Sequence, residues 1–344
     1  MVSLVVMIVE EKEVINSMIE LRKDYLLDRW VILAPMRKKR PRDFVRQQVA
    51  AASNLCVFCA GHEKLTPPEI GMVAGPGGQW AMRWFSNMFP AAEESGQKDV
   101  RTDNTFYTFA ASYGVHEVIV ETPSHDRQLW DFSPAELKQL LQVYASRIAA
   151  LEARDGIKYV AVFKNHGNEA GASIAHSHTQ VVAVNVLPSL VMEEAAAVKS
   201  HAQSRGQCPY CSIVDSEKGS YRRCFENNHA VAFTPYASRF NFEVWIFPKR
   251  HFRQLSEAGE DELQGISELL TAILRKLKEL NAPYNYILHY LPSNASAGAG
   301  FSDFHFHIEV QPRLSVWAGF ELNTDIIINS VTPEDAAKFY RGEE

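Results

Sequence analysis

Two pairs of cysteines have the spacing of metal ligands. Cys56 and Cys59 form one Cys-x-x-Cys motif, and Cys208 and Cys211 form another. A tetrahedral zinc site needs four sulfur, nitrogen or oxygen ligands, so each pair requires two more. Histidines at matching places in the two halves of the chain supply them. The sequence therefore predicts two structural Cys₂His₂ sites that tie distant segments together: Cys56, Cys59, His125 and His176 in the first, and Cys208, Cys211, His251 and His305 in the second.

Redox chemistry is the alternative interpretation of the cysteine pairs. The Cys-Pro-Tyr-Cys run at 208–211 resembles a glutaredoxin active site. Thioredoxin-like proteins, however, place one such motif in a shorter βαβ fold and rarely carry it twice. Two copies, each accompanied by histidines, favour metal binding. The fifth cysteine, Cys224, has no counterpart and is interpreted as a buried or incidental thiol.

The run from Gly171 to Gln180 is the densest stretch of reactive residue types. It contains His176-Ser177-His178 and then Gln180, and alternate residues of a strand share one face. An imidazole held in one orientation, here His178, can act as a nucleophile. The glycines, with Gly171 among them, and Ser173 can bring backbone N–H groups and a hydroxyl to a phosphate. The alternatives are a histidine-rich strand with only structural contacts, or a third metal site that uses His178.

An internal repeat shows which elements must position these residues. At an offset of 126 residues, five short segments of the second half coincide with segments of the first, and each half runs in the order Cys-x-x-Cys, single histidine, His-x-His. The matched pairs are Ala111-Ser112 with Ala237-Ser238, Glu117-Val118 with Glu243-Val244, His125 with His251, Gln128-Leu129 with Gln254-Leu255, and Glu136-Leu137 with Glu262-Leu263.

The hydrophobic periodicity repeats with the motifs. β-Branched and aromatic runs predict strands at 115–121, 158–163, 242–247 and 284–289. A capped helix begins at Ser133-Pro134 and extends to Leu151, and its counterpart runs from Leu263 to Leu277. Each half is thus an α+β half-barrel unit, and a helical linker joins the halves near 188–206. The predicted domains are 18–190, which carries the catalytic residues, and 191–344, after an extension at 1–17.

The composition excludes several classes of protein. The chain has 344 residues, 46% of them hydrophobic, and a net charge of −6. This acidity argues against nucleic acid as the main partner. Residues 1–9 are apolar but far shorter than the ~20 residues that cross a bilayer, and they lack the flanks of a signal peptide. The expectation is a cytoplasmic protein without membrane contact, in which thiols remain reduced.

Taken together, the motifs resemble the galactose-1-phosphate uridylyltransferase branch of the histidine-triad superfamily. The resemblance extends from Glu20 to the C-terminus and implies duplicated histidine-triad-like units: an antiparallel sheet or half-barrel with helices packed on it. The segments that carry it are Asp28 to Pro35, Arg37 to Pro41, the Cys-Val-Phe-Cys run at 56–59, Asn87 with Phe89-Pro90, Asn165 to Gln180, Phe247 to His251, and Ala318 to Glu321.

The resemblance implies a double-displacement reaction on a nucleotide sugar. His178 attacks the α-phosphorus, hexose 1-phosphate leaves, and a second phosphate takes the nucleotidyl group, which predicts ping-pong kinetics. The main expectation is transfer of UMP between UDP-hexose and hexose 1-phosphate by a homodimer. By resemblance, Gln180, Ser173 and Asn165 contact the phosphates, Arg40 and Asn87 face the nucleotide, and Glu321 and Phe320 face the sugar. Without the resemblance, Arg37 to Arg40 is a solvated basic run and Glu321 an exposed acid.

Two departures from the family pattern leave alternatives open. Ser177 stands where uridylyltransferases commonly carry proline, and His-Ser-His-x-Gln is similar to the ADP-glucose phosphorylase-like branch, which transfers adenylyl to inorganic phosphate. Some family members also lack the second Cys-x-x-Cys and bind metal, with iron possible, through one Glu and three His. The matching residues here are Glu194, His289, His305 and His307, although Cys208 and Cys211 favour the cysteine site.

The second His-x-His differs from the first at one more position. Glu309 stands where Gln180 stands in the first half, so the second motif is expected to be structural. A third hypothesis belongs to another class of protein: a zinc-stabilised module that binds nucleotides without turnover. The negative charge and the grouping of His178 with Ser173 and Gln180 count against it.

Overall fold

A computed structural model describes residues 19–39, 55–292 and 304–343. The expected extension at 1–17 and the candidate residue Arg40 lie outside the described residues. Within those ranges, no helix is long and apolar enough to cross a membrane.

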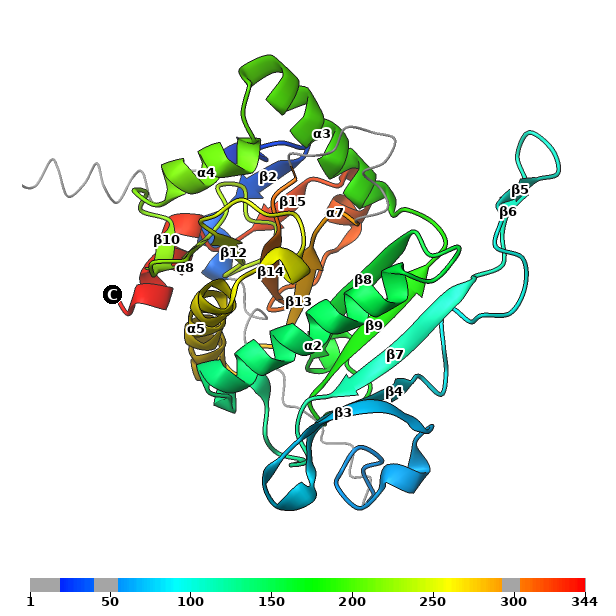
Figure 1. Cartoon of the computed structure of the whole chain (residues 1–344). Helices are drawn as coiled ribbons and strands as arrows, with labels where there is room; N and C mark the ends of the chain where they lie inside the picture. The colour runs from blue at the N-terminus through cyan, green and yellow to red at the C-terminus, as the bar shows by residue number, and fades with distance from the viewer. Residues whose placement is uncertain (1–18, 40–54, 293–303, 344) are drawn as a thin grey trace, which may run out of the picture.

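One large antiparallel sheet forms the centre of the described chain (Figure 1). From the first half it takes β3 (Glu69–Ala74), β4 (Trp80–Ser86), β7 (Gly114–Val120), β8 (Tyr159–His166) and β9 (His178–Val184). From the second half it takes β10 (Arg223–Glu226), β11 (Ala230–Phe233), β12 (Val244–Pro248), β13 (Tyr284–His289) and β14 (His307–Pro312). This confirms the α+β class and the antiparallel sheet.

The strand order makes the duplication visible. The sheet runs β10-β11-β12-β14-β13-β8-β9-β7-β4-β3, so each half contributes five neighbouring strands in the same internal order, and the two halves meet at β13 and β8. In that pair Asn285 lies opposite Asn165, and Tyr284 lies opposite His166. Because main-chain hydrogen bonds continue across this seam, the two repeats share one sheet.

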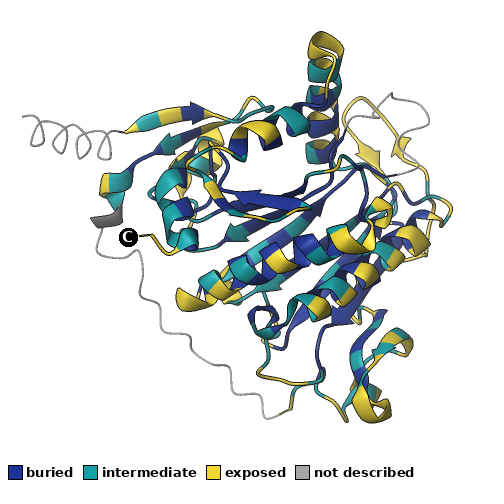
Figure 2. Ribbon diagram, turned by 60° about the vertical axis from the view of Figure 1, so that its left-hand side comes forward, coloured by how far each residue is buried: buried dark blue, intermediate teal, exposed yellow. Residues whose placement is uncertain are grey.

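Two long helices cover one face of the sheet side by side. α2 (Pro134–Glu152) packs on β8 and β9, and α5 (Glu260–Glu279) packs on β11 and β12 and against α2. Ser133 caps α2, since its hydroxyl accepts from the Glu136 N–H while the Glu136 carboxylate accepts from the Ser133 N–H. Exposed residues lie mainly on the outer sides of the helices and on turns (Figure 2).

The expected helices and strands are confirmed with small shifts of their ends. The expected linker at 188–206 is helical, as α3 (Ser189–Arg205). Among the described residues, the other α-helices are α4 (Pro209–Glu217), α7 (Gly319–Thr324) and α8 (Pro333–Arg341).

A small second sheet joins the two ends of the described chain, which the repeat did not predict. β1 (Glu20–Lys23) pairs with β2 (Trp30–Leu33), and β2 pairs in parallel with β15 (Ile327–Asn329). Val31, Leu33 and Ile327 are buried there with Ala237 of the second half. The N-terminal strands therefore pack with the second repeat. A further hairpin, β5 (Arg101–Thr102) with β6 (Thr108–Phe109), projects from the body beside β7 (Figure 1).

Candidate active site and metal centres

The first predicted metal-ligand set comes together in space. Sγ of Cys56 lies 3.6 Å from Nδ1 of His176, and Sγ of Cys59 lies 3.5 Å from Nδ1 of His125 and 3.7 Å from Nδ1 of His176. Zinc bonds of ~2.3 Å to sulfur and ~2.0 Å to nitrogen, at a tetrahedral angle, separate the two atoms by about 3.5 Å. The four side chains therefore fit a tetrahedral metal ion.

The second predicted set is arranged in the same way. Sγ of Cys211 lies 3.4 Å from Nδ1 of His251 and 3.6 Å from Nδ1 of His305, and Cys208 completes the group. Hydrogen bonding from Cys208, His251 and His305 lowers the pKa of the Cys211 thiol to about 3. A thiolate is the form of cysteine that binds metal.

In each set, a backbone carbonyl orients the histidine of the His-x-His motif, and the two carbonyls occupy equivalent positions of the repeat. Nε2 of His176 donates to the carbonyl of Thr122 over 2.7 Å, and Nε2 of His305 donates to the carbonyl of Pro248 over 3.0 Å. Thr122 and Pro248 are separated by the 126-residue offset of the repeat. With Nε2 protonated, each ring turns its Nδ1 lone pair toward the cysteines, which is the usual outer support of a metal-bound histidine.

The alternative ligand set of one Glu and three His does not assemble as a unit, because His305 turns to the cysteines. His289 instead lies 3.2 Å from Glu194 and 3.5 Å from Glu309, and it groups with His307 and Glu309. Burial lowers the pKa of His289, but the carboxylates of Glu309 and Glu194 outweigh burial and raise it to about 9. This buried cluster is internally ion-paired.

His178 is held in one orientation at the start of β9. Its Nδ1 donates to the carbonyl of His176 over 2.8 Å, and its ring packs edge-on against Phe58 with the centroids 5.4 Å apart. Only 7% of the residue is exposed. Burial, and then the charge of Lys164, lower the pKa of His178, so the ring is neutral at pH 7 and Nε2 carries its lone pair.

A buried polar network supports the other face of the strand. Lys164 donates to the Glu121 carboxylate (2.6 Å), to the Ser177 hydroxyl (3.0 Å) and to the His178 carbonyl (3.1 Å). Ser177 and Thr179 each donate to Glu121 over 2.5 Å. The residues before and after His178 are therefore fixed by one carboxylate, and sequence reasoning missed both Lys164 and Glu121.

Gln180 and Asn87 are brought together by a residue that sequence reasoning also missed. Nε2 of His116, on β7, lies 3.0 Å from Oε1 of Gln180 and 3.0 Å from the side-chain nitrogen of Asn87. Gln180 follows His178 by two residues on β9, so the two side chains share a face. The only signal in the sequence was the alternation of the 114–120 strand, which puts His116 on the face of Val118 and Val120.

Asn165 lies near the end of β8, and Gly171 and Ser173 belong to the segment that leads from β8 into β9. Asn165 accepts a hydrogen bond from Asn285 over 2.8 Å. Gly171 has φ +86°, a conformation that glycine adopts readily, and a Cβ there would lie 3.8 Å from the Asn165 amide nitrogen. Ser173 is exposed, and the neighbouring Ile174 packs against the cluster that contains Phe58.

The structure does not bring the predicted sugar-binding residues to His178. Phe320 and Glu321 lie on α7, and the Glu321 carboxylate accepts from the Ala318 N–H at the start of that helix. Figure 1 shows α7 near β15, well separated from the arrowhead of β7, whose last residue pairs with His178. Their role in sugar binding stays a prediction.

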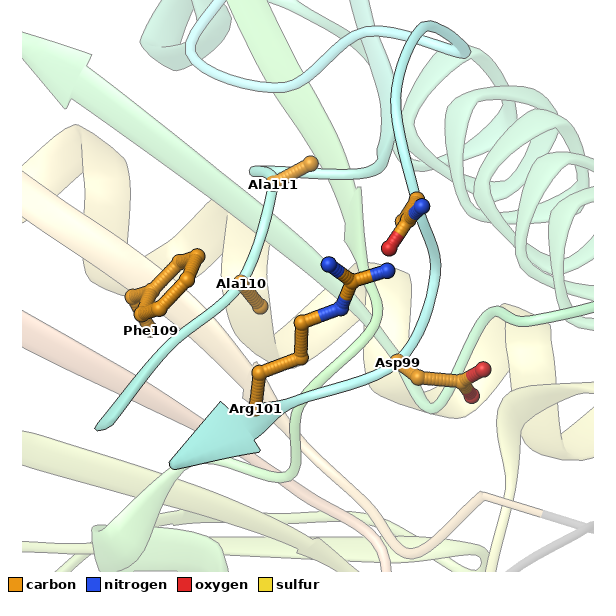
Figure 3. Close-up of a pocket in the computed structure, with 6 residues that line it drawn as sticks. Asp99, Arg101, Phe109, Ala110 and Ala111 are labelled. Carbon is orange, nitrogen blue, oxygen red and sulfur yellow. The ribbon is translucent and has the colours of Figure 1, made fainter. Parts of the chain in front are cut away.

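A separate hollow lies beside the β5–β6 hairpin. Figure 3 shows the Arg101 side chain reaching across it between Asp99 and Ala111. Its lining, which also includes Gln97, Phe109 and Ala110, contains neither histidine nor cysteine. It therefore offers none of the chemistry expected at His178.

Comparison with known proteins identifies the family of the chain. A family model described as a domain of unknown function, DUF4921, matches residues 90–339. ADP-glucose phosphorylase of Arabidopsis thaliana is 35% identical over 336 residues, which are 95% of this chain and 93% of that protein. Galactose-1-phosphate uridylyltransferase of Thermotoga maritima is 31% identical over 336 residues, 95% of this chain and 99% of that protein.

An ADP-glucose phosphorylase is also found among the similar solved structures. The crystal structure of the Arabidopsis thaliana ADP-glucose phosphorylase with bound ADP-glucose superposes with a TM-score of 0.81 at 34% identity, and covers 95% of this chain and 100% of the other. These relatives and the shared fold define the class of the protein as a nucleotidyltransferase, built here from a duplicated α+β unit. The chain belongs to the DUF4921 family, and the curated proteins similar to it include galactose-1-phosphate uridylyltransferases and an ADP-glucose phosphorylase.

Proposed function

We propose that this enzyme is an ADP-glucose phosphorylase that works through a covalent adenylyl-histidine on His178. Nε2 of His178 attacks the α-phosphorus of ADP-glucose, the bond to the bridging oxygen breaks, and glucose 1-phosphate leaves. An oxygen of inorganic phosphate then attacks the same phosphorus, the N–P bond breaks, and ADP is released. One nucleophile thereby serves two in-line displacements.

The orientation of His178 is the observation that carries this proposal. The Nδ1–H bond to the His176 carbonyl leaves the lone pair on Nε2, and the packing of Phe58 holds the ring. Gln180 and Asn165 contribute amide donors for the phosphate oxygens, which carry developing charge in the transition state. The loop of Gly171 and Ser173 contributes backbone and hydroxyl donors beside them.

Two observations support adenine and inorganic phosphate over the uridylyl reaction. The His-Ser-His-x-Gln run with Ser177 resembles the ADP-glucose phosphorylase-like branch, and the Ser177 hydroxyl lies in the network of Lys164 and Glu121. The Arabidopsis thaliana ADP-glucose phosphorylase is also somewhat more similar to this chain than the Thermotoga maritima uridylyltransferase, at 35% against 31% identity.

Transfer of UMP between UDP-hexose and hexose 1-phosphate, our main expectation from the sequence, is the second candidate. It is favoured by the match to the Thermotoga maritima uridylyltransferase, which covers 99% of that protein. The two candidates share His178 and the covalent step, and they differ in the base and in the acceptor.

Intact-protein mass spectrometry separates these candidates. We expect ADP-glucose to add an AMP group to the wild type and inorganic phosphate to remove it as ADP. An adduct from UDP-glucose that hexose 1-phosphate removes would establish the second candidate. Nucleotide binding without any adduct would establish the non-catalytic module.

Two matched variants locate the reacting atom. His178→Asn should bind ADP-glucose but form no adduct. His307→Asn changes the equivalent histidine of the second repeat, whose Nδ1 also donates to a carbonyl two residues before it (3.0 Å), and should still form the adduct. An adduct on His178→Asn would overturn the assignment.

For the metal centres, we propose one structural zinc in each Cys₂His₂ set, at a distance from the reacting phosphorus. A bound zinc would tie its Cys-x-x-Cys loop to the histidine strand, and in the first half that strand carries His178 two residues after His176. Elemental analysis should find about two zinc per chain; iron in place of the second zinc would correct the identity of the metal there. The homodimer stays a prediction, which light scattering can test.

A further inference from the structure

Two amide side chains beside His178 are the groups proposed to face the substrate phosphates. An amide has a donor end and an acceptor end, and a flip exchanges them at the same place. Phosphate oxygens accept hydrogen bonds, so only the NH₂ end of Gln180 or Asn165 stabilises them. Whatever fixes the polarity of these two amides therefore matters for the reaction.

His116 has a tautomer that is set by the main chain. The backbone N–H of Ala91 donates to Nδ1 of His116 over 3.1 Å, so Nδ1 is the acceptor. Burial lowers the pKa of His116 and keeps the ring neutral. In a neutral ring the other nitrogen carries the proton, so Nε2–H donates to Oε1 of Gln180 over 3.0 Å.

The contact of Asn87 with His116 is compatible with this tautomer. The side-chain nitrogen of Asn87 lies 3.0 Å from Nε2 and 3.5 Å from Nδ1. A partner along the Nε2–H axis would be much farther from Nδ1, so the Asn87 amide lies over the face of the ring. The backbone N–H of Phe89 donates to Oδ1 of Asn87 over 2.9 Å and fixes that amide in turn. The in-plane hydrogen bond of Nε2 belongs to Gln180.

Asn285, in the second half of the chain, fixes the orientation of the Asn165 amide in a similar way. Its NH₂ group donates to the backbone carbonyl of Ala170 and to Oδ1 of Asn165, each over 2.8 Å. The Ala170 carbonyl cannot flip, so it fixes the polarity of Asn285, and Asn285 then fixes that of Asn165. The two asparagines lie directly opposite each other in the β13–β8 register.

We propose that His116 and Asn285 are positioning residues that lock the NH₂ ends of Gln180 and Asn165 toward the substrate phosphates. His116 donates to the side-chain oxygen of Gln180, and Asn285 donates to that of Asn165. The Ala91 N–H fixes His116, and the Ala170 carbonyl fixes Asn285. The NH₂ donors are then in place before charge develops on the phosphate oxygens, and no reorientation is needed during the reaction. This inference rests on the proposed function.

A double-mutant cycle tests the inference for His116. The rate of adduct formation from ADP-glucose is measured for wild type, His116→Ala, Gln180→Ala and the double variant. We expect His116→Ala to slow adduct formation by about tenfold, because the Gln180 amide then samples both orientations. In the Gln180→Ala background the same change should cost less than about twofold. An equal loss in both backgrounds would show that His116 acts only through the fold and would overturn the inference.

A conservative variant and a second cycle check the same idea. His116→Gln retains an N–H donor near Oε1 of Gln180 and should recover part of the lost rate, whereas no recovery counts against the role. Asn285→Ala and Asn165→Ala form the second cycle, with the same expected coupling. Thermal unfolding of every variant identifies any loss that comes from an unfolded protein.

Binding measurements separate a failure of this inference from a failure of the proposed function. Both cycles are repeated in the His178→Asn background, with the Kd for ADP-glucose measured by calorimetry. Coupling in Kd without any adduct on the wild type would disprove the proposed function and leave the positioning roles standing. An adduct on the wild type without coupling in either measurement would disprove the positioning roles alone.

Discussion

The ammonium group of Lys164 donates a hydrogen bond to the backbone carbonyl of His178, 3.1 Å away. Lys164 is 1% exposed, and both side chains of its ion pair with Glu121 are buried. A buried charge is tolerated when it is paired and hydrogen-bonded, as here. The strand that carries His178 is thus supported from within the core.

Removal of one partner of this ion pair should strongly destabilise the protein. Lys164→Met leaves the Glu121 carboxylate buried without its cation, and we expect the free energy of unfolding to fall by roughly 3–5 kcal/mol. The double variant Lys164→Met/Glu121→Gln should be less destabilised than the sum of its single variants. Urea unfolding measures all three. Additive losses would contradict a direct interaction between the pair.

Metal content should follow the two cysteine sets separately. Cys59→Ser and Cys211→Ser should each reduce bound zinc from about two to about one per chain, because each removes one ligand of one set. Cys59→Ser should also impair adduct formation more, since its set includes His176, two residues before His178. Cys224→Ser is the matched control: Cys224 belongs to neither set and should leave the zinc content unchanged.

The Glu136 carboxylate, in the first turn of α2, should contribute to the loss of stability in acid. Two hydrogen bonds from Arg127, at 2.7 and 2.8 Å, and those from Ser133 lower the pKa of Glu136 to about 2. A carboxyl with a lowered pKa stabilises the fold fully above its unfolded value of 4.5, and this stabilisation is lost as the pH falls from 4.5 toward 2. The side chain is about a third exposed, so solvent screening limits the effect to about 1 kcal/mol.

The variants Glu136→Gln and Arg127→Gln check this pH dependence. Each should flatten the dependence of the free energy of unfolding on pH between 4.5 and 2, as measured by urea unfolding at each pH. Unchanged slopes in both variants would show that another carboxyl is responsible.

The backbone at Gly171 should matter to the reaction as well as to stability. Its φ of +86° is unfavourable for residues with a Cβ, so Gly171→Ala should cost about 1–2 kcal/mol and distort the turn beside Asn165. Gly206→Ala is the matched control, because Gly206 has φ +75° at the end of α3 with open space around it. Both variants should lose similar stability by thermal unfolding. Only Gly171→Ala should slow adduct formation; equal rates in the two variants would exclude a role for the turn.

The repeat made much of this structure predictable. Landmarks 126 residues apart placed α2 and α5 on equivalent segments, and the predicted strand Tyr284–His289 agrees with β13. The ligand sets were predictable because cysteine and histidine occur in the same order in both halves, and tetrahedral geometry demands four ligands. The face shared by His178 and Gln180 followed from the alternation of a strand.

The residues that support the site were not predictable for a physical reason. His116 and Asn285 contact residues of neighbouring strands, and these contacts depend on strand register, which local periodicity does not determine. Lys164 and Glu121 stand in runs that read as ordinary alternating strands, and their pairing depends on the neighbours of β9. The small sheet of β1, β2 and β15 joins segments about 300 residues apart, which no local pattern connects.

The seam between β8 and β13 has a consequence for the two halves as separate molecules. A fragment that ended after α3 would keep His178, Gln180 and the first cysteine set, but β8 would become an edge strand with unpaired N–H and C=O groups. Such an edge can be covered by a second fragment, which would restore the sheet without restoring Asn285. If the proposed roles hold, the two halves have different tasks: the first carries His178, and the second supplies Asn285, which donates to Oδ1 of Asn165.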